Sequence, residues 1–355
     1  MIIQQPSLDW VFKPAWPLDR HAETAAAQHQ QQLTKPIGAL GELEVIAQRF
    51  AAWQGRADPR LEQIAVRVFA ADHGVCAKAV SAYPQEVTAQ MIGNFLRGGA
   101  AISVLARQLG ADLQVCNMGT VTPPPDLPGL KNCAIAPGTR DFTEQAAMAH
   151  AELVRALRAG ADAVPEGIQL FVGGEMGIGN TTTAAALVSA LLDLPPDMTV
   201  GPGTGVDAAG LVRKRRVVES ALALHGEAIS AAESPALKAL ETIGGFEIAA
   251  LAGAYIRCGQ RGIGVLVDGY ISTAAALCAV RINPQVRDWL MFGHVSSEPA
   301  HRLVLKHLGA LPLLDLRLRL GEGSGAALAV PLLRAALDLH NNMASFATAG
   351  VAGRE

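Results

Sequence analysis

Five short apolar runs, each followed by a polar or glycine-rich turn and then by an Ala- and Leu-rich stretch, constrain the fold of this chain most strongly. The runs are residues 66–70, 113–116, 168–172, 263–267 and 289–292. Short apolar runs that alternate with helical segments are typical of parallel strands in βαβ units. Such strands are covered by helices, so they do not alternate between apolar and polar residues. The pattern predicts an α/β fold, a parallel sheet with helices on both faces.

The two ends of the chain have a different pattern, with helical segments and no strand-like run. In residues 1–60 we expect helices, one of them starting at Thr34 before a Lys-Pro pair. Residues 322–355 predict one Ala- and Leu-rich helix and a tail. We expect these terminal segments to pack together as a small helical domain, and residues 61–321 to form the large α/β domain.

Charge and cysteine content argue against several classes of protein. Lys and Arg number 29 against 32 Asp and Glu, giving a net charge of −3, whereas nucleic-acid-binding proteins carry a basic face. Five cysteines without a C-x-x-C pair predict neither a disulfide framework nor a zinc site. Residues 1–10 lack the basic and apolar regions of a signal peptide, and the apolar stretch 262–280 is broken by Asp268 and Gly269. We therefore expect a cytoplasmic protein without nucleic-acid or membrane partners.

The turn after the 168–172 run is the strongest candidate for a ligand site, because ligands of open α/β sheets bind beyond the carboxyl ends of the strands. Four glycines and Glu175 fall within seven positions there, and glycines let backbone N–H groups approach a ligand closely. The next helix start would attract an anion, with Asn180 and the threonines as caps. The alternative is an ordinary strand-to-helix turn, since the spacing is neither that of a P-loop nor that of a dinucleotide-binding motif. We favour a phosphate or carboxylate site formed by Gly174, Met176, Gly177, Ile178, Gly179, Asn180 and Thr181.

A second glycine-rich turn, Gly201–Asp207, opens another predicted helix. In this turn Gly203, Thr204 and Gly205 could form an anion-binding nest, with Lys214 further along the helix. The basic run 213–216 spans more than half of the helix circumference, so most of it predicts a solvated face. The spacing supports both roles for Lys214 equally.

Glu322 lies between glycines in a third motif, Gly321–Gly325, just before an apolar helix. A carboxylate flanked by glycines can approach a substrate closely, and with a pKa raised by an apolar site it would serve as a general base. The alternative is an exposed glutamate at a helix N-terminus, stabilised by the helix dipole. The spacing alone supports both interpretations equally.

The segment Ser81–Met91 contains the start of another predicted helix. A helix start that carries Ser81, Tyr83, Gln90 and Met91 could line a pocket for a flat, mostly apolar ring. Taken alone, this segment is better interpreted as an N-capped amphipathic helix.

Polar residues also follow other predicted strands. Asp72 and His73 follow the first run, and a turn-capping Asp with a hydrogen-bonded His is favoured over catalysis or metal binding, because no third ligand is near. Asp268 either binds a hydroxyl group or caps the next helix, with capping as the default. His294 and His301 are too far apart in the sequence for a compact metal pair.

In this order the motifs resemble those of the nicotinate-nucleotide:dimethylbenzimidazole phosphoribosyltransferases, of the lower-ligand branch of cobalamin synthesis. The resemblance covers nearly the whole chain, and the motifs are specific as a set. They are Lys35–Gly41, Asp72–Val75, Ser81–Met91, Gly98–Ala101, Gly173–Thr183, Gly201–Asp207, Asp268–Gly269, Gly321–Gly325 and Met343–Phe346. Two positions depart from the family pattern, since Ala39 replaces a common Ser and Asn117 a common Asp.

The resemblance implies a dimeric enzyme with a Rossmann-like large domain and a small domain made from both chain ends. It implies transfer of 5-phosphoribose from nicotinate mononucleotide to 5,6-dimethylbenzimidazole, giving α-ribazole 5′-phosphate and nicotinate, with no metal or cofactor. Glu322 then corresponds to the catalytic base, and Glu175 would stabilise positive charge on the ribose or hold its hydroxyls. The benzimidazole would be held by Ser81, Tyr83, Gln90 and Met91, and the nucleotide by the glycine-rich loops with Lys214, Asp268 and Ser296.

Two other functions stay open: a non-catalytic nucleotide-binding sensor of the same fold, and a metal-dependent sugar or nucleotide kinase. A kinase would need ATP and a magnesium-binding acidic pair, and no P-loop supports it. A sensor has no need for a carboxylate at the reacting centre, so Glu322 distinguishes the sensor from the enzyme.

Overall fold

Seven parallel strands form one sheet at the centre of the computed structural model, which describes residues 7–352. Their order in the sheet is β3-β2-β1-β4-β5-β6-β7, so the order reverses between β1 and β4. Every neighbouring pair is parallel, which confirms the predicted parallel α/β sheet. The strands are β1 (Ile64–Ala71), β2 (Asp112–Gly119), β3 (Leu130–Asn132), β4 (Leu170–Met176), β5 (Gly264–Val267), β6 (Leu290–His294) and β7 (Pro312–Leu314).

The five predicted strands are β1, β2, β4, β5 and β6. The sequence analysis missed β3 and β7, which lie at the two edges of the sheet. Each has only three residues and none of them is fully buried, so neither leaves an apolar run in the sequence.

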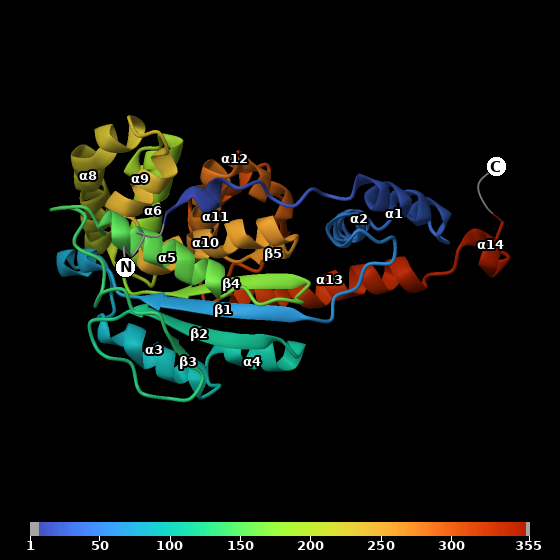
Figure 1. The fold of residues 1–355 in the computed structure, drawn as a ribbon, viewed down its shortest axis with the longest axis horizontal. Helices are drawn as coiled ribbons and strands as arrows, with labels where there is room; N and C mark the ends of the chain where they lie inside the picture. The colour runs from blue at the N-terminus through green and yellow to red at the C-terminus, as the bar shows by residue number, and fades with distance from the viewer. Residues whose placement is uncertain (1–6, 353–355) are drawn as a thin grey trace, which may run out of the picture.

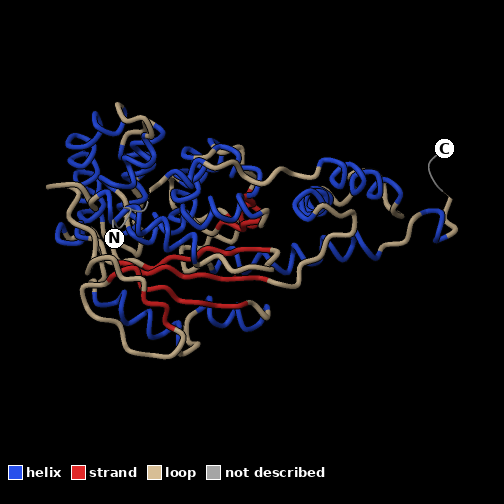
Figure 2. The backbone as a smooth tube through the Cα atoms, in the orientation of Figure 1, coloured by secondary structure: helices blue, strands red, loops and turns tan. Residues whose placement is uncertain are grey.

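Helices cover both faces of the sheet (Figures 1 and 2). Alternate residues of β1 point to opposite faces, as in any strand. Val66 and Val68 join a core with α2, α3, α4 and α13, whereas Phe69 and Ala71 join a core with α5, α6 and α8 to α12. The helices are α1 (Arg20–Gln32), α2 (Glu42–Gln54), α3 (Glu86–Leu96), α4 (Ala101–Leu109), α5 (His150–Asp162), α6 (Asn180–Leu192), α7 (Pro196–Thr199), α8 (Ala208–Ser230), α9 (Pro235–Ile243), α10 (Phe246–Arg261), α11 (Tyr270–Ile282), α12 (His301–His307), α13 (Ser324–Asn342) and α14 (Phe346–Ala349).

Beyond the amino edge of the sheet, α1 and α2 lie beside the end of α13 (Figure 1). An isolated bridge pairs Leu33 with Ser345. Gln30 Nε2 donates to His340 Nδ1 over 2.8 Å, and His340 Nε2 donates to the carbonyl of Ala57 over 2.8 Å. The first half of α13 packs under the sheet instead, so this one helix takes part in both groups of contacts. The division into domains at residues 60 and 322 stays a prediction.

The expected helix start at Thr34 is wrong. The helix begins eight residues later, at Glu42, with Gly41 as its N-cap. Between them the chain makes tight turns, in which the N–H groups of Ala39 and Gly41 donate to the carbonyls of Pro36 and Gly38. Thr34 itself donates its backbone N–H to the carbonyl of Ala344.

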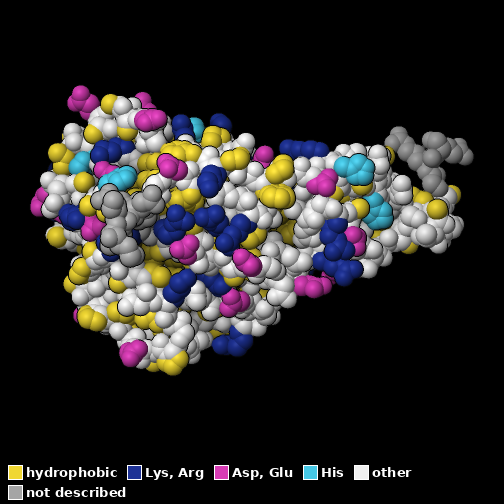
Figure 3. Space-filling model, in the orientation of Figure 1, with side chains coloured by type: hydrophobic (Ala, Val, Ile, Leu, Met, Phe, Trp, Pro, Cys, Tyr) yellow, Lys and Arg dark blue, Asp and Glu magenta, His cyan; other side chains and the backbone are white. Residues whose placement is uncertain are grey.

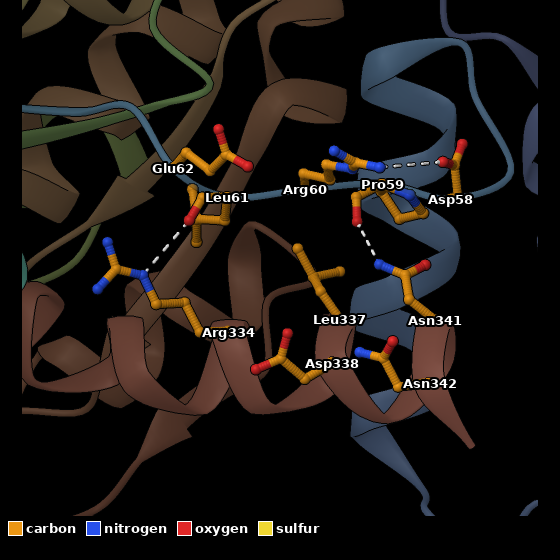
Figure 4. A pocket seen from close by; sticks show the side chains of 10 residues that line it. All are labelled: Asp58, Pro59, Arg60, Leu61, Glu62, Arg334, Leu337, Asp338, Asn341 and Asn342. Carbon is orange, nitrogen blue, oxygen red and sulfur yellow. Dashed lines mark hydrogen bonds and ion pairs between the residues drawn. The ribbon is translucent and has the colours of Figure 1, made fainter.

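A cavity opens where the chain passes from the terminal helices into β1 (Figure 4). Asn341 Nδ2 donates to the carbonyl of Pro59 over 2.9 Å, and Arg334 Nε donates to the carbonyl of Leu61 over 3.3 Å. These contacts fix residues 58–62 over α13. The cavity lies at the amino edge of the sheet, opposite the edge where α/β sheets bind their ligands.

Lys and Arg side chains gather near the middle of the face shown in Figure 3, with Asp and Glu side chains beside them. Across residues 7–352, the helices are too short or too polar for any of them to cross a membrane. The first part of the N-terminal stretch considered for a signal peptide, residues 1–6, and residues 353–355 of the C-terminal tail lie outside the described residues.

Candidate active site

A cavity of about 150 Å³ lies at the carboxyl edge of the sheet, among the loops that follow β4, β5, β6 and β7. The loop between α7 and α8 completes its wall. Ten of the residues predicted for the site line this cavity. They are Glu175, Met176, Gly177, Ile178, Asn180, Thr181, Gly203, Thr204, Ser296 and Glu322.

The sequence analysis assigned no role to seven other residues of the wall, namely Gly269, Tyr270, Ile271, Glu298, Arg319, Leu320 and Gly321. Gly269 to Ile271 follow Asp268 at the end of β5, so their position after a strand was a usable signal. Arg319 belongs to no motif and is the positively charged member of the wall.

Gly179 is the N-cap of α6, with a left-handed φ of +94°. The predicted capping by Asn180 and the threonines is therefore wrong, and their side chains serve neighbouring elements. Asn180 Nδ2 donates to Glu175 Oε2 over 2.5 Å, and Thr183 Oγ1 is 2.9 Å from His73 Nδ1. The helix start is thus free of a side-chain cap, although the N–H groups of Asn180 and Thr182 donate to the carbonyls of Gly177 and Gly179.

Lys214 ties the two glycine-rich loops together from behind the wall of the cavity. Its Nζ donates to Thr181 Oγ1 over 2.9 Å and to the carbonyl of Gly201 over 2.9 Å. The side chain is buried, and burial lowers the pKa of Lys214 to about 8. The other basic residues of its run are not fully buried, as predicted for that face. Gly205 is exposed at the turn and does not line the cavity.

Glu322 is a buried carboxyl at the edge of the cavity, so the alternative of an exposed helix-terminal glutamate is wrong. Its backbone is left-handed, with a φ of +69°, and Gly323 follows at +88°. Burial raises the pKa of Glu322 to about 7; the backbone N–H of Ile102 opposes the rise and the charge of Asp268 adds to it. Within the described residues, its Oε2 atom has no hydrogen-bond partner. A carboxyl with these properties can accept a proton near neutral pH.

Glu175 lies beside Glu322 at the end of β4. Burial raises the pKa of Glu175 well above its ordinary value; the charges of Asp268, Glu247 and Glu322 add to the rise, and the hydrogen bond from Asn180 opposes it. Burial and these charges favour the protonated form of Glu175, and a cation bound beside it would favour the ionised form.

Asp268 lies beneath the cavity and does not line it. Its Oδ1 accepts from the N–H of Ala326 over 2.8 Å and its Oδ2 from the N–H of Gly323 over 3.1 Å. It therefore caps a helix, as expected by default, but the helix is α13 and not the following α11. His294 Nε2 is 3.5 Å from Asp268 Oδ1.

The four candidates for benzimidazole binding lie apart from this cavity wall, on the loop before α3 and on α3 itself. Tyr83 and Gln90 are exposed, and Ser81 and Met91 are half-buried. The helix is fixed to the glycine-rich loop, because Thr88 Oγ1 accepts from the N–H of Ile178 over 3.2 Å. Met91 and Met176 pack against the same apolar core, so the two regions are neighbours.

Asp72 and His73 are buried and make structural contacts. Asp72 Oδ2 accepts from the N–H of Val121 over 2.8 Å, and His73 Nε2 is 2.8 Å from Glu247 Oε1. No group of three or more His, Cys, Asp or Glu side chains in residues 7–352 is arranged to hold a metal ion.

Comparison with known proteins identifies relatives over almost the whole chain. A family model described as "Phosphoribosyltransferase" matches residues 15–351. The nicotinate-nucleotide–dimethylbenzimidazole phosphoribosyltransferase of Pseudomonas aeruginosa is 56% identical over 352 residues, which cover 98% of this chain and 99% of the relative. The enzyme of the same name from Pseudomonas syringae is also 56% identical, with the same coverage.

The crystal structure of CobT from Thermus thermophilus superposes with a TM-score of 0.89 at 48% identity, and covers 94% of this chain and 100% of that one. Sequence and structure therefore agree over the sheet, the terminal helices and the loops of the cavity. The chain belongs to the nicotinate-nucleotide–dimethylbenzimidazole phosphoribosyltransferase family of enzymes.

Proposed function

We propose that this enzyme transfers 5-phosphoribose from nicotinate mononucleotide to 5,6-dimethylbenzimidazole, giving α-ribazole 5′-phosphate and nicotinate for the nucleotide loop of cobalamin. The observation that carries the proposal is Glu322 at the edge of a glycine-rich cavity. It is a buried carboxyl with a pKa near 7, and its Oε2 accepts no hydrogen bond from the described residues. A sensor has no use for such a group at that point, and the sequence has no P-loop that would support a kinase.

The nucleotide occupies the cavity. The start of α6 lacks a side-chain cap and reaches the cavity wall with Asn180 and Thr181, so its dipole favours an anionic group there. Arg319 offers a cation on the opposite loop, and its Nη2 donates to the carbonyl of Gly203 over 3.3 Å. These groups hold the phosphate and the nicotinate carboxylate, while Ser296 offers a hydroxyl from the loop after β6.

The benzimidazole binds against α3, next to Met91, Gln90, Tyr83 and Ser81. The order of the strands reverses between β1 and β4, and open α/β sheets bind ligands at such a reversal. The acceptor residues follow β1, and the nucleotide loops follow β4 to β7. Glu322 lines the cavity, and the N–H of Ile102 at the start of α4, the helix after α3, lowers the pKa of its carboxyl.

The reaction needs one proton acceptor. The ring nitrogen of the nucleotide carries a formal positive charge, so the bond to the anomeric carbon breaks with its electron pair going to that nitrogen, and nicotinate leaves without a general acid. One azole nitrogen attacks the anomeric carbon from the opposite face, which inverts β to α. The other azole nitrogen loses its proton to Glu322. Glu175 faces the positive charge of the bound nucleotide, which favours its ionised form and lets it stabilise that charge.

Purified protein incubated with nicotinate mononucleotide and 5,6-dimethylbenzimidazole, without added metal, tests the proposal. Chromatography should detect release of nicotinate that depends on the azole, together with a new ribosylated product. Binding of the nucleotide without any release would instead support a sensor, and a phosphorylated product formed only with added ATP and Mg²⁺ would support a kinase.

We also propose that the enzyme is a cytoplasmic homodimer, as the family resemblance implies. Light scattering of the purified protein should give twice the mass of one chain, which is 37.0 kDa. A monomeric mass, or recovery of the protein outside the cytoplasmic fraction of its cell, would contradict this part of the proposal.

A further inference from the structure

The backbone N–H groups of Glu322 and Gly323 are held by residues at the ends of two strands of the sheet. On one side, the N–H of Glu322 donates to the carbonyl of Glu175 at the end of β4, over 3.2 Å. On the other side, the N–H of Gly323 donates to Asp268 Oδ2 after β5, over 3.1 Å. Both residues of the peptide are left-handed, and a non-glycine residue adopts that conformation only where its surroundings impose it.

Asp268 is directed at the start of α13 and does not reach the cavity. Its side chain is fully buried, it is absent from the wall of the cavity, and each oxygen accepts a backbone N–H from the start of α13. A helix N-terminus favours a nearby carboxylate, and here the carboxylate comes from another strand, so it fixes the helix relative to the sheet. The contacts of Asp268 therefore act on the segment that carries Glu322 and Gly323.

We propose that Asp268 is a positioning residue for the catalytic base. It holds the Gly323 amide and the first turn of α13 so that the Glu322 carboxyl stays at the edge of the cavity. His294, on β6, lies beside Asp268, with 3.5 Å between its Nε2 and Asp268 Oδ1 and no hydrogen bond to that Nε2 from the described residues. Glu322 and Gly323 are thus held from the end of β4 and from the residue after β5. This inference rests on the proposed function, in which Glu322 takes the azole proton.

The charge of Asp268 provides a readout that simple loss of structure would not affect. The groups around Glu322 are Glu175 on β4, Asp268 after β5 and His294 on β6, with Glu247 of α10 further back and Arg319 on its own loop. The negative charge of Asp268 raises the pKa of Glu322. Neutralising Asp268 should therefore move the acid limb of the kcat profile to lower pH, besides lowering kcat itself.

The test is the Asp268→Asn variant. An asparagine has the same shape, and its Oδ1 can accept one of the two N–H groups. Its NH₂ group would then face the other N–H, donor against donor. We expect kcat to fall by about tenfold to hundredfold, as for a catalytic group displaced by about an ångström, with the KM for nicotinate mononucleotide changed less than about threefold. If the Asn variant does not fold, Asp268→Ser serves in its place. Serine keeps one short hydrogen-bond acceptor without the charge, so the acid limb should shift in the same direction.

The matched control is Asp19→Asn. Asp19 caps α1 by accepting the N–H of Ala22 over 2.8 Å, far from the cavity. Asparagine caps helices about as well as aspartate, so this variant should keep its stability, its kcat and the position of the acid limb. A folded Asp268 variant with wild-type kcat, or with lower kcat and an unmoved acid limb, would overturn the inference while leaving the proposed function intact. Absence of nicotinate release from the wild type would overturn both.

Discussion

The backbone N–H of Glu322 donates to the backbone carbonyl of Glu175, with 3.2 Å between the two atoms. This bond joins the end of β4 to the loop before α13 and places two buried carboxyls side by side. The loops approach so closely that Gly174 has no space for a Cβ beside the Glu322 carbonyl, and Gly321 has none beside Glu175 Oε1. The glycines of both motifs are therefore needed for this approach as well as for ligand contact.

Glu322→Gln should lower kcat by at least about 10²-fold and leave the KM for nicotinate mononucleotide nearly unchanged, because a general base acts only in the transition state. Steady-state release of nicotinate measures both constants. Near-wild-type turnover would remove Glu322 from the role of base.

The wild-type kcat should fall as the pH is lowered through about 7. The pKa of Glu322 is raised to about 7 by burial, and only its ionised form can accept the azole proton. A kcat profile between pH 5 and 9 in buffers of constant ionic strength would show this limb. The residual activity of Glu322→Gln should lack it, and a limb that persists in this variant would have to come from another group.

The same variant should be more stable than the wild type above neutral pH. The pKa of Glu322 is raised in the folded state, so the folded state holds this proton more tightly than the unfolded state, and its contribution to stability is lost as the pH rises towards 7. A glutamine avoids this loss, which amounts to up to about 3 kcal/mol. Urea unfolding at pH 5 and pH 8 measures the free energy of unfolding of both proteins. The difference in this free energy between variant and wild type should grow with pH, and a constant difference would contradict the raised pKa of Glu322.

Binding of nicotinate mononucleotide should release a proton from Glu175. Burial and three neighbouring carboxyls raise its pKa well above the ordinary value, and a pyridinium cation bound beside it should lower that pKa again. Calorimetry at pH 7 in buffers of different ionisation enthalpy measures the release. The Glu322→Gln background removes the second titrating carboxyl, so proton release that remains in it is assigned to Glu175. Adding Glu175→Gln should abolish the release; a buffer-independent heat in the single variant would exclude this role for Glu175.

Gly174→Ala should destabilise the fold and reduce activity, because its Cβ would overlap the backbone of Glu322 and Gly323. Overpacking of this kind costs about 1–3 kcal/mol. The matched control is Gly226→Ala in α8, where a Cβ meets no atom within 4 Å and alanine favours the helix. In thermal unfolding, the melting temperature of the control should equal or exceed that of the wild type, and that of Gly174→Ala should be lower. Equal melting temperatures for the two variants would contradict the close approach.

The sheet and the glycine-rich loops could be predicted because their signals are local: an apolar run, a turn and a helix follow one another in the sequence. The role of Asp268 could not, since its partners belong to a helix that begins 56 positions later and no local pattern links the two. Local capping rules also failed at Thr34 and Asn180, where glycines with positive φ start the helices instead. The spacing around Glu322 supported an exposed and a buried residue equally, and only the fold decided between them.

The packing of the terminal helices sets an order of events during synthesis. Gln30 and Leu33 find their partners at His340 and Ser345, so α1 and α2 leave the ribosome long before the helix that they pack against. The strands from β1 onward can pair as they emerge, whereas the apolar side of α2 stays unpaired with α13 until nearly the whole chain has been made. The last contacts to form are therefore those of α1 and α2 with α13. A ribosome that stalls before residue 324 would leave one face of the sheet without the helix α13 that covers part of it.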